Sequence, residues 1–538
     1  MITFGKAVIA VLLVWACLGG GDPVVAESHG DQSQQASEES CAKSTIPRTL
    51  DADQRSVTDH VLKAEEGKLK YTATAGSLPV TVGGQDEQCT LFFVGYHAES
   101  KQKGRPVSFV FNGGPGASSV YLHLGALGPK VVPFKEGGGM PDFPYALKDN
   151  ARTWLWFTDL VFVDPVGTGY SRCAREEGHR SQKPDERGPR MSPEKKAWGV
   201  EEDVDVLARF IRLYLTRQER WLSPKFLVGE SYGGLRVAAL ADRLQSQYGI
   251  SVNGAVLVSP ALEFGLLKGG RYNVLPWIVS VPSFAATARF HGRASGEVPG
   301  KQHPRGALKE VERFAVKKLL PALADGNAKT VGDQLAAYVG LSDEDVSRWR
   351  YRISLSMFVR YLLEDKERLV SVYDGTQSAT DPSPGGISSR GQDSLLVRLN
   401  AVLTPLMNSY VRETLGFESD IRYRILNEKT ARRWNWRSGL NQDQGFVGVA
   451  EDLKRTMSMN PKLQVLVTHG VYDLITPYFG SVLVIGQMAL DSSLAANVTV
   501  DVYDGGHMFY THPVAHAKFF DRAKAFFEKA TGVHRESK

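Results

Sequence analysis

Residues 225–234 (KFLVGESYGG) constrain the fold of this chain more than any other stretch. The apolar run 226–228 is typical of a buried strand, and the apolar residues that follow Gly234 recur at helical spacing. The glycines on both sides of the serine let two backbone segments approach closely, so a strained turn can hold a hydroxyl group out at the end of the strand. Ser231 is therefore the candidate nucleophile. The alternative is an ordinary strand-to-helix turn, in which glycine and serine are common.

The composition is that of an ordinary globular protein. Of the 538 residues, 42% are hydrophobic and 23% are charged, so the chain is long enough for a large core and an inserted second one. The 64 Lys and Arg residues exceed the 59 Asp and Glu residues by a net charge of +5, and the charges are mixed along the chain. So mild an excess is weak support for a nucleic-acid partner, and we expect none.

The first 26 residues have the features of an export signal. Lys6 precedes an apolar stretch at residues 7–18, and small residues lead to Ala26, after which we expect cleavage. The apolar stretch is too short to span a bilayer, and we expect no membrane span later in the chain. We therefore expect a periplasmic or extracellular protein. The alternative is a lipid anchor on Cys17, which the bulky Trp15 disfavours.

Removal of the signal would leave three of the four cysteines, namely Cys41, Cys89 and Cys173. An odd number in an exported chain permits one disulfide and one free thiol, and the sequence does not choose the pair. The chain has no C-x-x-C and no H-E-x-x-H spacing. We therefore expect no metal site and no cofactor.

We expect a flexible segment at residues 27–67, because its part up to about Gln54 is rich in Ser, Gln, Glu and Asp. Residues 68–82 and 89–97 then carry β-forming side chains that alternate or cluster around a Gly-Gly pair. This pattern predicts edge strands of a sheet.

A glycine-rich turn follows the strand that we predict at residues 107–111. It comprises residues 112–119 and has the sequence NGGPGASS. A turn of this kind at a strand end can point backbone N–H groups at an anion, so we interpret it as an oxyanion hole. The alternative is a tight loop that binds nothing.

Strands and helices alternate around these two motifs. A buried-type strand is predicted at residues 160–164, a helix at residues 195–215 after a polar, exposed stretch at 174–193, and a further strand at residues 254–258. This order of elements is typical of a largely parallel α/β sheet.

Together these motifs resemble those of the serine carboxypeptidase family, which belongs to the α/β-hydrolase superfamily. The motifs are NGGPGASS at 112–119, DPVGTGYS at 164–171, GESYGG at 229–234, HGVYDLITP at 469–477 and GGHM at 505–508. They recur in the family's order and extend over most of the chain after about Lys68. The combination is far more specific than G-x-S-x-G alone, which many esterases and lipases share. The resemblance implies an α/β-hydrolase fold with a mostly parallel central sheet flanked by helices and an inserted helical cap.

The order of catalytic residues in α/β-hydrolases is nucleophile, acid, histidine. After Ser231, a strand predicted at residues 464–468 leads to Asp473, and a strand predicted at residues 498–503 leads to His507. We expect Asp473 to orient His507 and to stabilise its charged form. His507 would take the proton from Ser231 and return it to the leaving amine.

Other residues are alternatives for the acid and the base. Asp504 is a second candidate acid, but it lies too close to His507 in the same turn to approach it from a separate strand end. His469 and His512 are candidate bases. His469 ends the strand that carries the acid, and His512 precedes Pro513 at the start of a predicted helix.

The resemblance also implies the roles of residues around the triad. The backbone N–H groups of Gly114 and Tyr232 would form the oxyanion hole, in which the loss of one donor typically costs about 10²- to 10³-fold in rate. Asn112 and Glu230 match residues that bind the C-terminal carboxylate of the substrate.

The chain departs from the family pattern close to these residues. A second acidic partner is expected shortly after the NGGPG turn, where this chain has Ala126. Tryptophan is usual at the position of Phe111, and cysteine is usual at the position of Ala117. These departures affect the carboxylate-binding network and leave the triad intact.

The strand and helix alternation lapses between Pro260 and about Asp443. Amphipathic helices are predicted there at residues 309–323, 343–363 and 401–414, with a mobile Ser, Pro and Gly loop at 376–392. We therefore divide the chain into a signal peptide, a flexible segment, a first catalytic part, a helical cap and a second catalytic part, at residues 1–26, 27–67, 68–260, 261–443 and 444–538.

Arg360, Arg368 and Asp374 lie in the expected cap, which is the usual place for substrate selection in the superfamily. For each of them singly, a solvated helix face or a structural ion pair is the favoured interpretation.

The favoured function is a secreted serine carboxypeptidase that releases single residues from peptides with a free C-terminal carboxylate through an acyl-enzyme. An acyltransferase or esterase on the same triad is the first alternative, because an acyl-enzyme can be released to an alcohol as easily as to water and because Ala126 replaces an acid. A non-catalytic binding module on a hydrolase fold is the second, and the three filled triad positions disfavour it. The sequence sets neither residue preference nor oligomeric state.

Overall fold

The computed structural model describes residues 49–65, 67–83, 87–100, 104–174, 193–268, 272–298, 303–386, 392–437 and 447–532. The predicted signal, Cys17, Cys41 and nearly all of the polar stretch 174–193 lie outside these residues. Within them, every helix is too short or too polar to cross a membrane.

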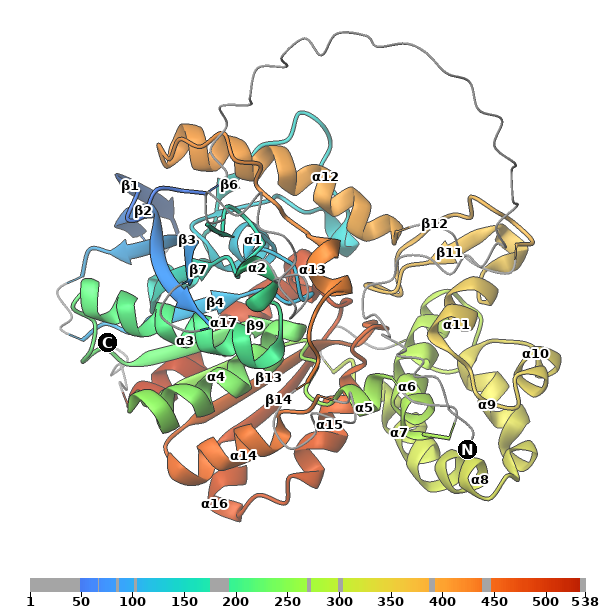
Figure 1. Ribbon diagram of the computed structural model, residues 1–538. Coiled ribbons are helices and arrows are strands. Elements are labelled where there is room, and N and C mark those ends of the chain that lie inside the picture. The colour runs from blue at the N-terminus through green and yellow to red at the C-terminus, as the bar shows by residue number, and fades with distance from the viewer. Residues whose placement is uncertain are drawn as a thin grey trace, which may run out of the picture.

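A ten-stranded sheet occupies the centre of the molecule, in the order β1-β2-β3-β7-β4-β9-β10-β13-β14, with β8 paired to β3 (Figure 1). Strands β1, β2 and β3 are antiparallel to one another, β3 is antiparallel to β7, and all neighbours from β7 to β14 are parallel. The strands are β1 (Arg55–Ala64), β2 (Gly67–Val82), β3 (Glu87–Ala98), β4 (Val107–Phe111), β7 (Asp159–Val163), β8 (Arg172–Cys173), β9 (Lys225–Glu230), β10 (Gly254–Val258), β13 (Gln464–Gly470) and β14 (Val498–Tyr503). The predicted mostly parallel α/β sheet is confirmed.

Helices cover both faces of the sheet, which explains why its central strands are continuous apolar runs. Strands β4, β7, β10 and β13 are buried along their whole length. Along β9, Leu227 packs on one side with α3 (Val200–Arg217), α4 (Tyr232–Tyr248) and α14 (Ala450–Met459), whereas Phe226 and Val228 pack on the other side with α17 (Pro513–Thr531).

The edge of the sheet differs from the prediction. Strand β1 lies inside segment 27–67, which was expected to be flexible, and pairs with β2 over ten residue positions. The polar composition misled the prediction, because an edge strand tolerates polar side chains on its solvent face. Strands β2 and β3, predicted as edge strands, therefore have neighbours on both sides.

A group of helices lies beside the sheet and has a hydrophobic core of its own (Figure 1). It consists of α6 (Leu275–Phe290), α7 (Lys309–Phe314), α8 (Leu320–Ala324), α9 (Gly332–Val339), α10 (Asp343–Arg348) and α11 (Leu355–Tyr361), with the hairpin of β11 (Arg368–Val370) and β12 (Ser378–Thr380). The short helix α5 (Phe264–Leu267) precedes this group and packs in the core of the sheet. We call this group the helical lobe. Its core also includes Tyr472, Leu474 and Tyr478, so the lobe packs against the chain that follows β13.

The predictions of helices between Pro260 and Asp443 are only partly confirmed. The helix predicted at 309–323 is present as α7, the π-helical turn η5 (Ala315–Leu319) and α8 in succession. The helix predicted at 343–363 is wrong as a single element, because Arg350 and Tyr351 adopt φ values of 52° and 62°, which separate α10 from α11. The helix predicted at 401–414 starts earlier.

That helix is α12 (Ser394–Ser409), which continues into the π-helical turn η8 (Tyr410–Thr414). Asp393 caps the N-terminus of α12, and its carboxylate accepts the N–H groups of Leu395 and Leu396. The buried residues of α12 belong to the core of the sheet and not to the core of the helical lobe.

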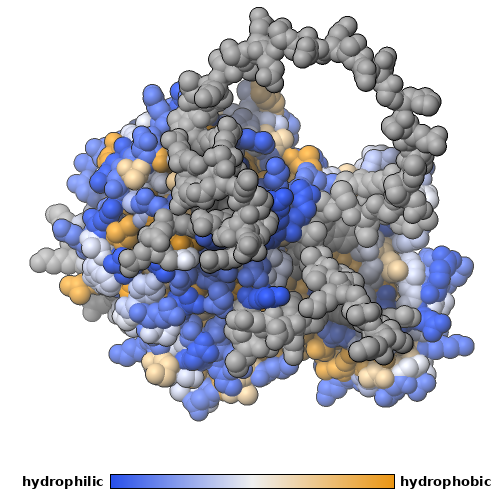
Figure 2. All heavy atoms as spheres, in the orientation of Figure 1, coloured by the Kyte–Doolittle hydropathy of each residue, from blue (hydrophilic) through white to orange (hydrophobic). Residues whose placement is uncertain are grey.

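Short elements complete the fold. They are α1 (Val120–Leu122), η1 (His123–Leu127), β5 (Lys130–Val131), η2 (Glu136–Gly138), β6 (Lys148–Asp149), η3 (Trp154–Trp156), α2 (Pro193–Lys196), η4 (Gly306–Leu308), η6 (Ala328–Val331), η7 (Glu364–Lys366), α13 (Glu428–Arg432), α15 (Tyr478–Gln487), α16 (Ser492–Ala495) and η10 (Phe509–Thr511). On the face shown in Figure 2, outside the grey atoms, hydrophilic side chains are mixed with small apolar patches.

A disulfide between Cys89 and Cys173 joins β3 to β8 and supplies the pairing that the sequence left open. In the region expected to be a cap, Arg360 forms a buried ion pair with Asp381 at 2.9 Å, as favoured from the sequence. Part of the predicted loop 376–392 is the strand β12, to which Arg368 donates hydrogen bonds at Ser378.

Candidate active site

Ser231 lies in the sharp turn between β9 and α4. Its backbone has φ 62° and ψ −123°, a strained conformation for a residue with a side chain. A Cβ atom at Gly229 would lie 2.0 Å from the carbonyl oxygen of Gly233, so the turn requires glycine there. The backbone N–H of Ser231 donates to Val258 O at 2.9 Å, which fixes the turn at the end of β10. The turn leaves Ser231 at the lining of a pocket.

Asp473 and His507 meet as the order of the motifs predicts. The turn after β13 carries Asp473 and the turn after β14 carries His507, and His507 Nδ1 lies 2.8 Å from Asp473 Oδ2. Both side chains are buried. Because Nδ1 faces Asp473, Nε2 is the ring nitrogen left for the pocket, which His507 lines together with Ser231.

The backbone of His507 is held on both sides. Its N–H donates to the carbonyl oxygen of Tyr373, and its own carbonyl oxygen accepts the hydroxyl of Ser259 at 2.7 Å. Asp473 is fixed in a similar way, because Oδ1 accepts the backbone N–H groups of Ile475 and Thr476 at 3.0 and 2.9 Å. The pair is thus rigidly placed before any substrate binds.

The alternative bases have other partners. His469 is fully buried inside β13, where Nε2 contacts Ser481 Oγ at 2.8 Å and burial lowers the pKa of the imidazole to about 4. His512 pairs with Asp374 at 2.8 Å. Neither of these histidines lines the pocket of Ser231, whereas His507 does.

The charges around His507 favour its protonated form. Burial alone would lower the pKa of His507, but the carboxylate of Asp473 and the charge of Glu230 outweigh burial, so the pKa is raised above its usual value. An imidazole of this kind readily accepts a proton from a neighbouring hydroxyl group.

Glu230 is a buried carboxyl group at the end of β9, and it lines the same pocket. Burial raises the pKa of Glu230 to about 7, although the nearby His507 and the hydrogen bonds from Tyr510 and Asn112 favour the ionised form. Asn112 Nδ2 donates to Glu230 Oε2 at 3.0 Å. The structure thus brings together the two residues to which the resemblance assigns carboxylate binding.

The glycine-rich turn lies against the start of α4. Gly113, Gly114 and Tyr232 line the pocket with Ser231. Tyr232 is the first residue of α4, where N–H groups have no acceptor within the helix. Among the described residues, none accepts a hydrogen bond from the N–H of Gly114. These two amides are suited to stabilise a negative charge beside Ser231.

Thr476 is a residue of the site that was not predicted from the sequence. Its hydroxyl group lies 2.7 Å from Asp473 Oδ2, 3.0 Å from His507 Nδ1 and 3.0 Å from Ser259 O. It therefore joins the acid, the base and the end of β10. The HGVYDLITP motif contains this threonine, but only the fold shows that it reaches His507.

A buried ion pair under the glycine-rich turn was also missed. Arg236, which is 1% exposed, donates from Nε to Asp203 Oδ2 at 2.6 Å and from Nη1 to the carbonyl oxygen of Asn112. The pair ties α3 and α4 to the turn that presents Gly114. The available signal was a lone arginine among the apolar residues at the start of α4.

Apolar and aromatic side chains form the rest of the pocket. They come from the glycine-rich turn and α1, the chain between β10 and α5, α5 itself, the loop between β11 and β12, α12, the chain before α13 and the turns that carry Asp473 and His507. They are Ala117, Tyr121, Ala261, Phe264, Leu267, Tyr373, Leu396, Leu426, Ile475 and Met508. Such walls suit an apolar ligand.

Within the described ranges, no group of three or more His, Cys, Asp or Glu residues could hold a metal ion. The expected absence of a metal and of a cofactor stays a prediction.

Comparisons with known proteins agree with the motifs. Residues 66–258 match the model of a family described as serine carboxypeptidase. Serine carboxypeptidase-like 16 of Arabidopsis thaliana is 27% identical over 234 residues, which are 41% of this chain and 48% of that relative. Serine carboxypeptidase-like 51 of the same plant is 32% identical over 162 residues, which are 30% of this chain and 28% of that relative. The chain thus spans less than half the length of these curated relatives.

A solved structure shows the same fold over most of the chain. The prohormone-processing carboxypeptidase Kex1 of Saccharomyces cerevisiae is 16% identical, with a TM-score of 0.51, over 87% of this chain and 93% of that one. The protein thus has an α/β-hydrolase fold. Its residues 66–258, which contain the glycine-rich turn and Ser231, are similar to the serine carboxypeptidase family. The resemblance inferred from the motifs is confirmed.

Proposed function

We propose that the protein is a serine-type carboxypeptidase, exported through the signal at residues 1–26, with Ser231, His507 and Asp473 as its catalytic triad. The observation that carries this proposal is Glu230. This buried carboxyl group has a pKa of about 7, is bonded to Asn112, and faces the pocket of Ser231 and His507. A neutral carboxyl group in that place can donate a hydrogen bond to the carboxylate of a peptide C-terminus.

The chemistry follows from the positions of these groups. With the substrate carboxylate bound at Asn112 and Glu230, Ser231 Oγ attacks the last peptide carbonyl and passes its proton to His507 Nε2. Asp473 stabilises the imidazolium, and the amides of Gly114 and Tyr232 stabilise the oxyanion. His507 then protonates the leaving amino acid, and a water activated by His507 hydrolyses the acyl-enzyme.

The apolar walls of the pocket support a preference for apolar side chains next to the scissile bond. The helical lobe and the hairpin β11–β12 supply part of the surroundings of the pocket, and we propose that residues 261–443 act as a cap. The first and second catalytic parts are then 68–260 and 444–538.

The test is a panel of N-blocked dipeptides, their C-terminal amides and the matching simple esters, with the products identified by mass. We expect release of the C-terminal residue from apolar dipeptides, weaker turnover of the amides, and loss of all activity in Ser231→Ala. A fluorophosphonate should label the parent on Ser231 and leave Ser231→Ala unlabelled. Unchanged labelling of Ser231→Ala would contradict the assignment of the nucleophile.

One observation favours a second function, an acyltransferase or esterase. Ala126 stands where the family has a second acid, so the carboxylate site lacks one of its usual groups. The same panel separates the two functions when an alcohol is added. Ester turnover with transfer to the alcohol, and without release from dipeptides, would favour the transferase.

A further inference from the structure

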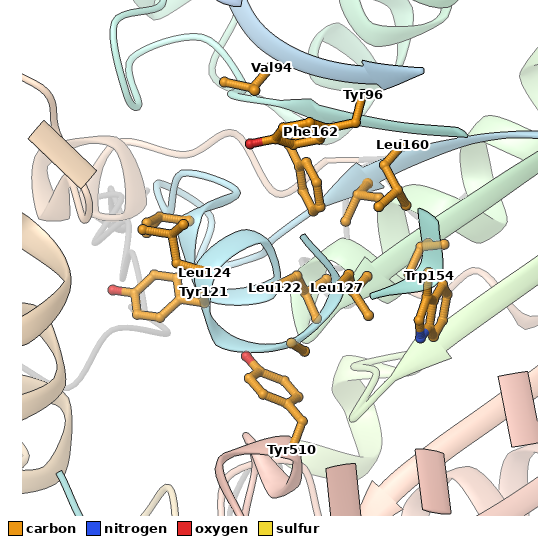
Figure 3. Packing of buried hydrophobic residues seen from close by; sticks show 14 of the residues in the cluster. Val94, Tyr96, Tyr121, Leu122, Leu124, Leu127, Trp154, Leu160, Phe162 and Tyr510 are labelled. Atoms are coloured by element: carbon orange, nitrogen blue, oxygen red, sulfur yellow. The ribbon is translucent and has the colours of Figure 1, made fainter. Parts of the chain in front are cut away.

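The tyrosine three residues beyond His507 contacts the group proposed to read the substrate carboxylate. Tyr510, in η10, donates its hydroxyl hydrogen to Glu230 Oε2 at 2.6 Å and is 2% exposed. Burial, with the charge of Glu230, raises the pKa of this phenol well above its usual value, so it stays a donor. In Figure 3 its hydroxyl points towards the turn formed by α1 and η1.

The chain makes room for this tyrosine at Gly125. A Cβ atom at that position would lie 2.9 Å from Cε2 of the Tyr510 ring, so a larger residue would displace the ring. The next residue, Ala126, is fixed through its carbonyl oxygen, which accepts hydrogen bonds from Asn150 Nδ2 at 2.7 Å and from His516 Nε2 at 2.9 Å. Tyr510 therefore packs on the same turn that lacks the second acid.

The two donors to Glu230 determine which of its oxygens can carry a proton. Asn112 Nδ2 and the Tyr510 hydroxyl both reach Oε2. No donor from the described residues reaches Oε1. A carboxyl oxygen has two lone pairs, and those of Oε2 are both engaged. When Glu230 is neutral, its proton is therefore on Oε1.

We propose that Tyr510 is a positioning residue for carboxylate recognition. In this chain it replaces the second acidic residue that the family has at the position of Ala126. With Asn112 it orients Glu230 so that Oε1–H donates to the carboxylate of the substrate. This inference rests on the proposed carboxypeptidase function and adds a residue that the family motifs do not contain.

The pH dependence of binding should report this arrangement. His507, Asp473, Tyr121 and Tyr373 are the other ionisable groups that interact with Glu230, and Tyr510→Phe leaves all four in place. The hydrogen bond from Tyr510 favours the ionised carboxylate, so its loss raises the pKa of Glu230. Binding of a free-acid dipeptide weakens as Glu230 ionises, and this loss should occur at higher pH in the variant.

The experiment compares Tyr510→Phe with the parent enzyme, using one N-blocked dipeptide, its amide and its ester between about pH 5 and 9. Tyr510→Phe keeps the ring against Gly125 and removes only the hydroxyl group. We expect KM for the free acid to rise about tenfold below the pKa of Glu230. The midpoint of the KM profile should move to higher pH, and ester kcat/KM should stay within about threefold.

Two further variants separate positioning from packing. Glu230→Gln presents a donor without a titrating proton, so Tyr510→Phe added to it should no longer move any midpoint. Tyr503→Phe removes a hydroxyl from a neighbouring ring that stacks on Phe509 at 4.6 Å, and it should leave the acid and ester profiles unchanged.

The outcomes distinguish this inference from the proposed function. A parent that does not prefer acid over amide would overturn both. A parent that does prefer the acid leaves the proposed function standing. The role of Tyr510 alone would then be overturned if the midpoint of the KM profile does not move in Tyr510→Phe, or if kcat/KM falls equally for the acid and the ester.

Discussion

Thr476 lies between the two residues that would hold and move the catalytic proton. Its oxygen is close enough to share the Nδ1 hydrogen of His507 with Asp473, and its own hydrogen reaches either Asp473 Oδ2 or Ser259 O. All of these groups are buried, so removal of the hydroxyl leaves polar atoms without a partner and without water.

We expect Thr476→Val to reduce kcat for a small ester about 10- to 100-fold, which corresponds to the roughly 1–3 kcal/mol cost of an unsatisfied buried polar group. Because the hydroxyl contacts the acid and the base rather than the pocket wall, KM should change little. Thr476→Ser keeps the hydroxyl and should stay within about threefold of the parent. Steady-state ester kinetics and the rate of fluorophosphonate labelling measure both. Equal activity of the valine and serine variants would rule out this role.

The sequence predicted the placement of the residues that lie at strand ends within motifs of fixed order, and their catalytic roles stay predictions. Ser231 and His507 line one pocket, and Asp473 is hydrogen-bonded to His507, because parallel strands bring their carboxyl ends to one edge. Tyr510 and Arg236 were not predicted. Their partners lie far away in the chain, and such contacts depend on the packed fold rather than on local pattern.

At the scale of elements, one buried carboxylate links several strands and loops at the amino end of β7. Asp159, the first residue of β7, accepts Arg105 Nε at 2.7 Å, Arg220 Nη1 at 2.6 Å and the backbone N–H of Ala98 at 3.1 Å. Burial would raise the pKa of Asp159, but the hydrogen bond with His97 and the two guanidinium groups outweigh burial and hold the pKa well below its usual range.

Asp159→Asn should lower the free energy of unfolding at pH 7 by roughly 1–3 kcal/mol, because it leaves two partly buried guanidinium groups without their counter-ion. A carboxylate whose pKa is depressed in the folded state contributes stability above its unfolded pKa of about 3.9 and loses it as pH falls further. The difference between parent and variant should therefore shrink below about pH 4. Urea denaturation across this pH range measures it.

The control is Asp142→Asn, which removes the partner of Lys135 from an ion pair whose carboxylate is 84% exposed. An exposed pair contributes about 1 kcal/mol or less, so this variant should resemble the parent. A constant difference between Asp159→Asn and the parent down to pH 2 would contradict the assigned pKa direction.

Elements with a strong periodic pattern were predicted well, and elements fixed by tertiary contacts were not. The apolar runs of β4 and β10 coincide with their predicted limits. Strand β1 was missed because pairing with β2, and not burial, holds its polar residues in the sheet. The break between α10 and α11 at Arg350 has no glycine or proline to mark it in the sequence.

In the molecule as a whole, the helical lobe is coupled to the turn that carries the acid. Glu312 in α7 accepts the hydroxyl of Tyr478 at 3.0 Å and two hydrogen bonds from Arg305 at 2.7 and 3.0 Å. Tyr478 begins α15, just after the turn that contains Asp473 and Thr476. Tyr472 and Leu474, on either side of Asp473, lie in the core of the lobe. The lobe therefore supports the acid in addition to shaping the pocket.

A change in the pocket wall and a change in the lobe should accordingly affect dipeptide and ester turnover differently. Leu396→Ala alters a pocket wall, so it should raise KM for an apolar dipeptide more than it affects a small ester. Glu312→Gln instead weakens the contact that holds the start of α15. Because this change reaches Asp473 and not the pocket wall, we expect kcat for ester and dipeptide to fall by a common factor, up to about 10² for a displacement near 1 Å.

The matched control for Glu312→Gln is Glu310→Gln on the same helix. Glu310 accepts the exposed hydroxyl of Tyr338 at 2.9 Å, so its replacement should leave both activities unchanged. The quantity to measure is the ratio of dipeptide to ester kcat/KM, which should stay constant in Glu312→Gln while each value falls. If the ratio falls and ester hydrolysis is unaffected, the lobe acts on substrate selection alone. The packing of Tyr472 and Leu474 would then be a structural contact with no effect on the function of Asp473.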